Sequence, residues 1–473
     1  MFPLSYRHLV AALGCALPLA AAAQSTPVSR LDHIVVTPSR SAQLASEVIG
    51  DVSVIDGEDL QRAGQTSVAE ILSRQPGVQF YNSGGPQTVS SIYLRGTNRG
   101  HTLVLVDGVR VNAATHGDAN WGAIDPALIE RIEILRGPAS SLYGSNAIGG
   151  VVNIITRKSG EDRPVSAWGN MGYGTHGTFK SSTGISGAHN GWDYTFSGFM
   201  ADSSGFNTTR PEAGQYTYNP DRDGYEQHGL SGSLGYQWHP GHHLGVSFMN
   251  SYIDGQFDDG GFPDARTLTR QQVYAITSTH QMTNAWESIL RFGLTKEENE
   301  SRTSWPGTFS TLQRNWSWQN NVNLTDDHVV SLVLERLEER VQSTVAYEAD
   351  ARDTNSVALI YRGRFNNVRT QASLRNDNIS HYGNKQTGSL GIDVDLNPNW
   401  TVGVAGSTGF KAPDFDFLYY PGLNNPDLKP EKSRSVEAHL SYDNDATQAS
   451  VTLYQNKIRD LIAGDPLTFI PEN

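Results

Sequence analysis

The sequence is almost without cysteine: its only one, Cys15, lies within residues 1–23. Arg7, the apolar run 9–20 and the small residues after it are typical of a secretory signal peptide, so cleavage would leave a chain without a thiol. An exported chain with no disulfide must be held together by its own core or sheet. Two alternatives remain for this stretch. A transmembrane helix would need a longer apolar run, and a lipoprotein signal would have a bulky residue in place of Ala12.

Long apolar runs and an excess of basic residues are also absent. No segment after the signal peptide offers the ~18 consecutive apolar residues that mark a transmembrane helix. The chain has 49 Asp and Glu against 36 Lys and Arg, and such an acidic chain is unsuited to nucleic acid because phosphate contacts need clustered cations. Glycine (47), tyrosine (19), phenylalanine (16) and tryptophan (9) are nonetheless abundant. This composition is typical of an outer-membrane β-barrel.

The motifs of common enzymes are missing as well. There is no His-Glu-x-x-His run and no Gly-x-Ser-x-Gly elbow. The glycine-rich stretch "RGPASSLYGSNAIGG" lacks the Gly-Lys-Ser/Thr ending of a phosphate loop, and "RGTNRG" lacks the spacing of a dinucleotide site. We therefore expect tight turns at these glycines, and a protein that is not an enzyme.

Residues 165–473 alternate between apolar and polar side chains, as strands with two different faces do. In "GLSGSLGYQW", Leu230, Leu234 and Tyr236 share one face, and serines occupy the other. Connections alternate between short turns (239–243, 397–399) and long polar segments (202–226, 253–267, 411–432). A membrane barrel has short turns at one end and long loops at the other, which a soluble sandwich, the alternative fold, does not require.

The strand count adds one expectation. Roughly fifteen strand candidates occur, whereas single-chain bacterial barrels have an even number. The sequence therefore predicts a large antiparallel transmembrane β-barrel over 165–473 that is incomplete at the C-terminus, with its last strands missing.

Residues 48–160 predict a small α/β domain. Ser67 and Glu70 form a capping box at a helix start, Asp107-Gly108 marks a hairpin turn, and Asp125 precedes Pro126 as a helix N-cap. A barrel of more than twenty strands has a lumen wide enough to need a plug. We expect this domain to be the plug, with residues 24–47 as a linker before it.

Four stretches resemble the TonB-dependent outer-membrane receptors. "DHIVVTPSR" resembles the TonB box. "SSIYLRGTNRGHTLVLVDGVRVN" and "RIEILRGPASSLYGSNAIGGVVNIIT" resemble the two signature stretches of the plug, and "GFKAPDFDFLYYPGLNNPDLKPEKS" resembles a barrel segment. Together they extend from about residue 32 to 461 in the order of the family. The plug sequence is most similar to that of the cobalamin receptors.

The resemblance implies active import of a large, scarce ligand across the outer membrane, with cobalamin as the first candidate. A ferric siderophore is the alternative within the family. Haem is disfavoured because no histidine occurs between Phe410 and Glu431. An ungated porin is an alternative of another class, but a passive pore needs neither a plug nor residues 32–38. The implied partners are TonB of the inner membrane, outer-membrane lipid and a corrinoid or siderophore, the chain being a monomer in the bacterial outer membrane.

The resemblance also implies a role for the segment after the signal peptide. In the family this box faces the periplasm and pairs as an added strand with TonB, which needs only a short exposed run of strand-forming residues. We therefore expect an unpartnered segment here; a linker without this role is the alternative. The residues concerned are Asp32, His33, Ile34, Val35, Val36, Thr37 and Pro38.

Two plug loops are expected to meet the ligand, because in the family it contacts the outward tips of plug and barrel loops. Amide, hydroxyl and aromatic groups suit a large polar ligand, although ordinary solvated loops would look the same. The candidates are Tyr81, Asn82, Ser83 and Gln87 in the first loop, and Asn112, His116, Asp118, Asn120 and Trp121 in the second.

A calcium site is a further expectation. "NPDRDGYE" begins like a calcium loop, but Leu230 stands where an EF-hand has glutamate. Barrel cobalamin receptors, however, bind calcium through acidic residues of early outer loops, and Asp221 and Asp223 match that pattern. Asp254 lies in the next long loop. Acidic residues without a metal role are the alternative.

Overall fold

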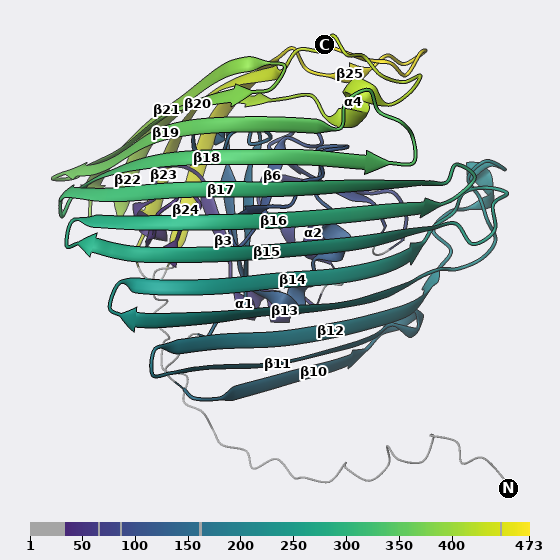
Figure 1. The fold of residues 1–473 in the computed structure, drawn as a ribbon, viewed down its shortest axis with the longest axis horizontal. Coiled ribbons are helices and arrows are strands. Elements are labelled where there is room, and N and C mark those ends of the chain that lie inside the picture. Colours follow the sequence, from purple (N-terminus) through teal and green to yellow (C-terminus); the bar gives the residue numbers. More distant parts are fainter. Residues whose placement is uncertain (1–33, 65–66, 86–87, 160–162, 445–446) are drawn as a thin grey trace, which may run out of the picture. The chain divides into compact units, whose positions relative to one another are not determined.

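The computed structural model describes residues 34–473 except 65–66, 86–87, 160–162 and 445–446. The predicted signal peptide lies outside the described residues. The described chain forms a small mixed domain followed by one sheet of 15 antiparallel strands (Figure 1). This confirms the predicted fold class of an α/β plug followed by a large antiparallel sheet. Among the described residues, no helix is long and apolar enough to cross a membrane.

The plug has a five-stranded sheet of order β3-β8-β9-β6-β7, in which only β6 and β9 are parallel. A two-residue pair, β1 with β2, precedes it, and β4 pairs with β5. The elements are β1 (Ile34–Val35), β2 (Gln43–Leu44), β3 (Val52–Ile55), α1 (Gly57–Ala63), α2 (Val68–Leu72), β4 (Val78–Asn82), β5 (Ser90–Leu94), β6 (Thr102–Val106), β7 (Val109–Arg110), β8 (Ile129–Arg136), α3 (Ser140–Tyr143) and β9 (Gly150–Thr156).

Local sequence signals explain where these elements begin and turn. The Ser67 hydroxyl accepts a hydrogen bond from the Glu70 N–H and caps α2. Asp107 and Gly108 both have positive φ, 49° and 79°, as the tight turn between β6 and β7 requires. Asp125 caps a short 3-10 helix that starts at Pro126 and leads into β8. All three predictions are confirmed.

The barrel strands are paired in chain order from first to last. Within the described residues, no pairing joins β10 to β24. The strands are β10 (Ser166–Tyr173), β11 (Phe179–His189), β12 (Trp192–Phe206), β13 (Asp223–His239), β14 (His242–Gln256), β15 (Arg266–Thr283), β16 (Trp286–Arg302), β17 (Gly307–Thr325), β18 (His328–Ser343), β19 (Ala351–Phe365), β20 (Val368–Ile379), β21 (Gly383–Asn397), β22 (Trp400–Lys411), β23 (Glu431–Asp443) and β24 (Gln448–Arg459). Helix α4 (Phe415–Tyr419) and the pair β25 (Ala463–Gly464) and β26 (Pro471–Glu472) lie outside this sheet.

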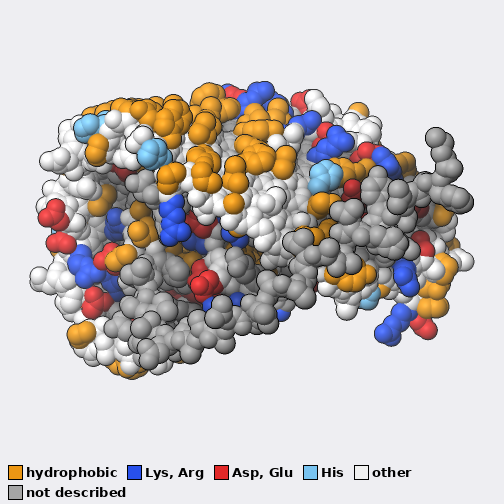
Figure 2. Space-filling view, turned by 90° about the horizontal axis from the view of Figure 1, so that it is seen from below, with side chains coloured by type: hydrophobic (Ala, Val, Ile, Leu, Met, Phe, Trp, Pro, Cys, Tyr) orange, Lys and Arg blue, Asp and Glu red, His pale blue; other side chains and the backbone are white. Residues whose placement is uncertain are grey.

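The two faces of the large sheet differ as the alternation predicts, with apolar side chains exposed and polar ones buried. On β13, Leu230 and Leu234 are each 47% exposed, whereas Ser231 is 3% exposed. Figure 2 shows hydrophobic side chains gathered together on the surface. A soluble sandwich would bury its apolar face, so this inverted pattern excludes that alternative and fits a surface in contact with lipid.

Aromatic and charged residues limit the apolar band at its two ends. Trp238, Trp286 and Trp400 lie beside short turns at strand ends and are partly exposed. Toward the opposite end of the strands, ion pairs occur on the sheet, with Arg302–Glu300 at 2.7 Å at the end of β16 and Arg336–Glu338 at 2.8 Å in the second half of β18. Strands such as β17, with 19 residues, are longer than the ~10 residues that cross a bilayer. The strands therefore extend into segments that were predicted as loops. The long connections are shorter than predicted and comprise residues 207–222, 257–265 and 412–430.

The plug contacts the inward face of many barrel strands. Gln227 on β13 donates to the Gly122 carbonyl, and Thr295 on β16 donates to the Arg110 carbonyl. On β23, Glu437 forms an ion pair of 2.7 Å with Arg95 of the plug. Because strands from β13 to β23 all contact the same small domain, the sheet curves around it.

Candidate functional site

The segment after residue 33 is held by the plug. Ile34 and Val35 pair with Leu44 and Gln43, and Val35 is fully buried. The expectation of an unpartnered segment is therefore wrong for the described part. Strand β2 follows closely enough in the chain to pair with β1, and the buried β-branched side chain of Val35 stabilises this pairing. Asp32 and His33 of the predicted TonB box lie outside the described residues.

Glu133 of β8 fixes the next two residues of this segment. One carboxylate oxygen accepts hydrogen bonds from the backbone N–H of Val36 at 3.0 Å and of Thr37 at 2.9 Å, and from the Thr37 hydroxyl at 2.7 Å. Asn153 donates to the same hydroxyl at 3.1 Å, and Tyr143 donates to the Thr37 carbonyl at 3.0 Å. Hydrogen bonds to a charged acceptor are stronger than neutral ones, so this carboxylate is the main polar anchor of the segment.

Arg40 extends the attachment to the barrel wall. Its guanidinium contacts Glu335 on β18 at 2.7 Å, and Glu335 also forms an ion pair with Arg375 on β20 at 2.6 Å. The Pro38 carbonyl accepts a hydrogen bond from Gln371 on the same strand at 2.8 Å. The segment thus contacts both the plug and the wall.

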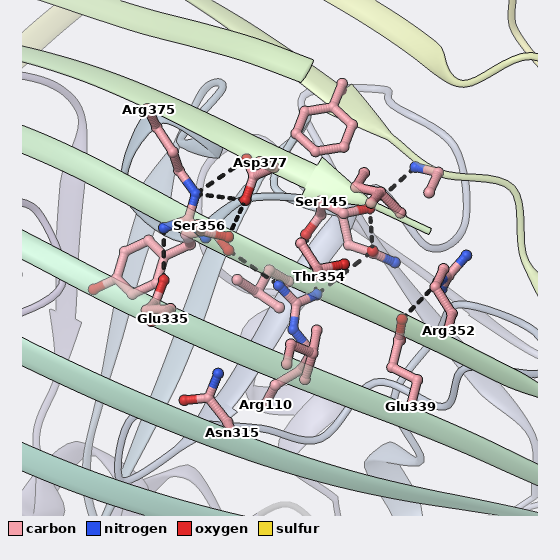
Figure 3. Close-up of a pocket in the computed structure, with 18 of the residues that line it drawn as sticks. Arg110, Ser145, Asn315, Glu335, Glu339, Arg352, Thr354, Ser356, Arg375 and Asp377 are labelled. Atoms are coloured by element: carbon pink, nitrogen blue, oxygen red, sulfur yellow. Dashed lines mark hydrogen bonds and ion pairs between the residues drawn. The ribbon is translucent and has the colours of Figure 1, made fainter. Parts of the chain in front are cut away.

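A charged pocket lies beside Arg40, between β7 of the plug and strands β18 to β20 (Figure 3). Arg110 donates to the carbonyls of Tyr143 and Ser145, both at 3.0 Å. Arg352 and Glu339, both on the wall, form an ion pair of 2.6 Å. The lining of the pocket thus includes ion pairs that link strands of the wall to one another.

The second predicted ligand loop, 112–121, is largely buried. Asn112, Asp118 and Trp121 are 2%, 4% and 1% exposed. The Asn112 side chain bonds the Val104 N–H at 2.8 Å and the carbonyls of Thr102 and Gly117 at 3.0 Å. In the arrangement described these three side chains lie in the plug's interior, and their contact with a ligand stays a prediction. A loop sequence shows which groups it carries but not which way they point.

The remaining members of this loop have mixed roles. Asn120 donates to Thr269 of β15 at 3.1 Å. Burial lowers the pKa of His116 to about 4 and raises the pKa of Asp118 to about 6, because a buried site disfavours the charged form of each side chain. At neutral pH His116 is therefore neutral, whereas Asp118 is mostly ionised at a cost in stability.

The first predicted ligand loop is more open. Tyr81 is 58% exposed and Ser83 is also exposed. Asn82 holds the loop in shape by donating to the Gly85 carbonyl at 3.0 Å and by accepting from Thr88 at 2.6 Å. Gln87 lies outside the described residues. Tyr81 and Ser83 therefore remain the best candidates for ligand contact.

The long connection between β22 and β23 rests on the second plug loop. In α4, Phe415 donates its N–H to the Ala114 carbonyl at 3.1 Å, and Asp416 donates to the Thr115 carbonyl at 2.9 Å. Burial raises the pKa of Asp416 to about 6. The segment that resembles the family's barrel motif thus contacts the plug directly.

Three carboxylates gather at the outer end of β13. Asp221, Asp223 and Asp258 each offer one oxygen within 4.8 Å of the others. Asp223 is 3% exposed and accepts hydrogen bonds from the Thr208 N–H and hydroxyl. Asp254, the third acid predicted from sequence, is not in this group and forms an ion pair with Arg266 at 2.9 Å. Asp258 takes its place, four residues along the same hairpin.

Sequence reasoning missed Glu133, Asn153, Glu335 and Asp258. Glu133 alone carried a signal, since a lone acid in the apolar run "RIEIL" demands a partner when buried.

A family model for the TonB-dependent Receptor Plug Domain matches residues 45–151, and one for the TonB dependent receptor-like beta-barrel matches residues 165–473. The chain belongs to the TonB-dependent receptors. Members of this family are transporters and receptors.

Two relatives align with most of this chain. A protein of Photobacterium profundum named Vitamin B12 transporter BtuB is 32% identical over 449 residues, covering 92% of this chain and 71% of its own length. A protein of the same name from Vibrio vulnificus is 30% identical over 480 residues, covering 95% and 75%.

Solved structures share the receptor's fold. The siderophore receptor PirA from Acinetobacter baumannii matches with a TM-score of 0.74 at 21% identity, covering 87% of this chain and 71% of that one. The FrpB iron transporter from Neisseria meningitidis matches with a TM-score of 0.74 at 14% identity, covering 88% and 74%. At such identities the likeness extends to the fold alone.

Proposed function

We propose that this receptor imports cobalamin across the bacterial outer membrane, driven through TonB. One observation carries the proposal: relatives named vitamin B12 transporters align at 30% identity or more over at least 92% of the chain. The siderophore receptor resembles it at 21% identity and in fold. A ferric siderophore is the second candidate ligand.

The ligand would meet the outer loops and the exposed tip of the plug. Tyr81 offers an aromatic face that is 58% exposed, and Ser83 beside it offers a hydroxyl group. The long connections 207–222, 257–265 and 412–430 belong to the same end of the sheet, since alternate turns of an antiparallel meander share an end. A large polar ligand can contact several such loops at once.

Calcium would order two of these loops. Asp221 and Asp223 precede or begin β13, and Asp258 follows β14, so an ion held by all three would tie together connections 207–222 and 257–265. Carboxylate oxygens are the ligands that Ca²⁺ prefers, and three acids this close repel one another without a cation. The neighbouring Thr208 already supports Asp223.

Energy coupling would use the segment 34–40. The outer membrane holds no ATP, so uphill import needs energy from elsewhere. Release of Val35 from β2 and of Thr37 from Glu133 would expose a short strand that adds to TonB by main-chain hydrogen bonds. The charged pocket beside Arg40 would open with it.

The test is a titration of the purified full chain with cyanocobalamin and, separately, with a ferric siderophore, each with and without calcium. We expect tight cyanocobalamin binding that strengthens with calcium. Tight binding of the siderophore alone would replace cobalamin by the second candidate. High conductance of the ligand-free chain in a planar bilayer would instead identify a porin.

A further inference from the structure

Three histidines form a row across neighbouring strands at the short-turn end of the sheet. His239 ends β13, His242 begins β14 and His280 lies near the end of β15. In the strand register His239 is opposite His242, and His242 is opposite His280. Directly paired residues in a sheet place their side chains on the same face, so the last two imidazoles lie side by side.

The spacing of the two paired rings suits a metal ion. The Nδ1 atoms of His242 and His280 are 3.2 Å apart. Two imidazole nitrogens bound tetrahedrally at 2.0–2.1 Å to zinc are separated by about 3.3 Å, which follows from the tetrahedral angle. The pair thus stands at the separation of two ligands of one ion without any movement of the backbone.

Neighbouring groups point the right nitrogen atoms toward this position. His280 Nε2 is hydrogen-bonded to the Ser278 hydroxyl at 2.9 Å. An Nε2–H that donates there leaves the lone pair of His280 on Nδ1, facing His242. Likewise, His239 Nδ1 bonds the Pro240 carbonyl at 3.1 Å, which leaves its Nε2 free to act as a ligand. The His239 ring centre is 5.7 Å from that of His242, within reach by side-chain rotation.

The row lies on the outward face of the sheet. Leu244, two residues after His242, is 45% exposed, and the Trp238 ring, 49% exposed, has its centre 5.7 Å from that of His280. The intervening His243 points to the opposite face, where its Nε2 contacts Asp193 at 2.9 Å. Hence His243 supplies a matched control of the same residue type in the adjacent position.

We propose that His242 and His280, completed by His239, bind a divalent transition-metal ion on the outer face of the sheet at its short-turn end. Imidazole ligands select zinc, copper or nickel over calcium and magnesium. A bound ion would link β15 to the β13–β14 hairpin. The site is separate from the acidic group at the other end of β13 and does not depend on which ligand is imported.

The first test is a titration of the full chain in detergent with Zn²⁺, with excess calcium present to saturate the acidic group. We expect one zinc ion per chain, with affinity reduced at least tenfold by His242→Ala or His280→Ala and unchanged by His243→Ala. Zinc affinity that is the same in the His242→Ala and His280→Ala variants as in the unsubstituted chain overturns the proposal.

A second measurement uses the unsubstituted protein and so does not depend on a variant folding. Electron paramagnetic resonance with one equivalent of Cu²⁺ should show hyperfine coupling to two or three imidazole nitrogens. Cu²⁺ should also quench part of the tryptophan fluorescence, and Trp238→Phe should remove that part. A copper spectrum without nitrogen coupling would exclude the site.

Discussion

The carboxylate of Glu133 accepts hydrogen bonds from both the backbone N–H and the hydroxyl group of Thr37, at 2.9 and 2.7 Å. Both side chains are fully buried. Arg131 pairs with the other carboxylate oxygen at 3.0 Å, so the oxygen that faces Thr37 is the one that loses its hydrogen bonds if the segment detaches, which is costly for a buried acceptor. This contact therefore resists detachment of the segment that would reach TonB.

Neutralising this acid should loosen the segment. Glu133→Gln keeps the size but weakens three hydrogen bonds, each of which is worth roughly 1.5–3 kcal/mol with a charged acceptor and about 1 kcal/mol with a neutral one. We expect a thiol placed by Ser39→Cys, which is buried in the folded chain, to react with maleimide at least roughly ten times faster in this variant. Glu130→Gln is the control, since Glu130 shares Arg131 with Glu133 but has the Lys158 N–H as its other partner in place of Val36 and Thr37. Equal reaction rates in the two variants would contradict the anchoring role.

Proline at the centre of the segment should uncouple uptake from binding. Val35→Pro deletes a backbone donor that an added strand needs, so uptake by cells should be lost while surface binding of the ligand stays unchanged. Val35→Ile retains the donor and the β-branched side chain and should support uptake. Persisting uptake by the proline variant would show that the segment does not couple to TonB.

Substitutions in the group of three acids should weaken calcium binding, whereas substitution of the nearby Asp254 should not. Asp223→Asn and Asp258→Asn each remove one carboxylate from the proposed calcium site and should weaken Ca²⁺ binding at least tenfold, as measured by isothermal titration. Asp254→Asn breaks the ion pair with Arg266 but leaves the group of three intact. Its calcium affinity should equal that of the unsubstituted chain; a loss there as large as at Asp258 would argue against the geometry.

Asp118 should make the plug loop less stable as the pH rises. Burial raises its pKa from 3.8 to about 6, so the folded state holds the proton more tightly than the unfolded state. The resulting stability is complete below pH 3.8 and is lost as the pH rises through about 6, with a ceiling of about 3 kcal/mol. Amide hydrogen exchange of residues 112–121, corrected for the intrinsic rates, should become faster as the pH rises. The variant Asp118→Asn should not show this pH dependence. Identical pH dependence in the two proteins would rule out this side chain as the cause.

Local signals in the sequence determined much of the fold. The alternation around Leu230 and Ser231 assigned the two faces of β13 because successive side chains of a strand must point in opposite directions. Ser67 and the Asp107-Gly108 pair marked a helix start and a hairpin turn because each satisfies a backbone requirement within a few residues. The family motifs then gave the order of plug and barrel.

Only the tertiary structure decided which of these groups meet. Thr37 is 96 positions from Glu133, and Arg40 is 295 from Glu335. Asn112 and Trp121 are buried in the plug although the sequence of their loop is largely polar. Asp258, and not Asp254, lies beside Asp221. Such encounters depend on strand register and on how the sheet wraps around the plug, and a local pattern contains neither. The pairing of His242 with His280 has the same origin, since a shift of one residue in the register would place them on opposite faces.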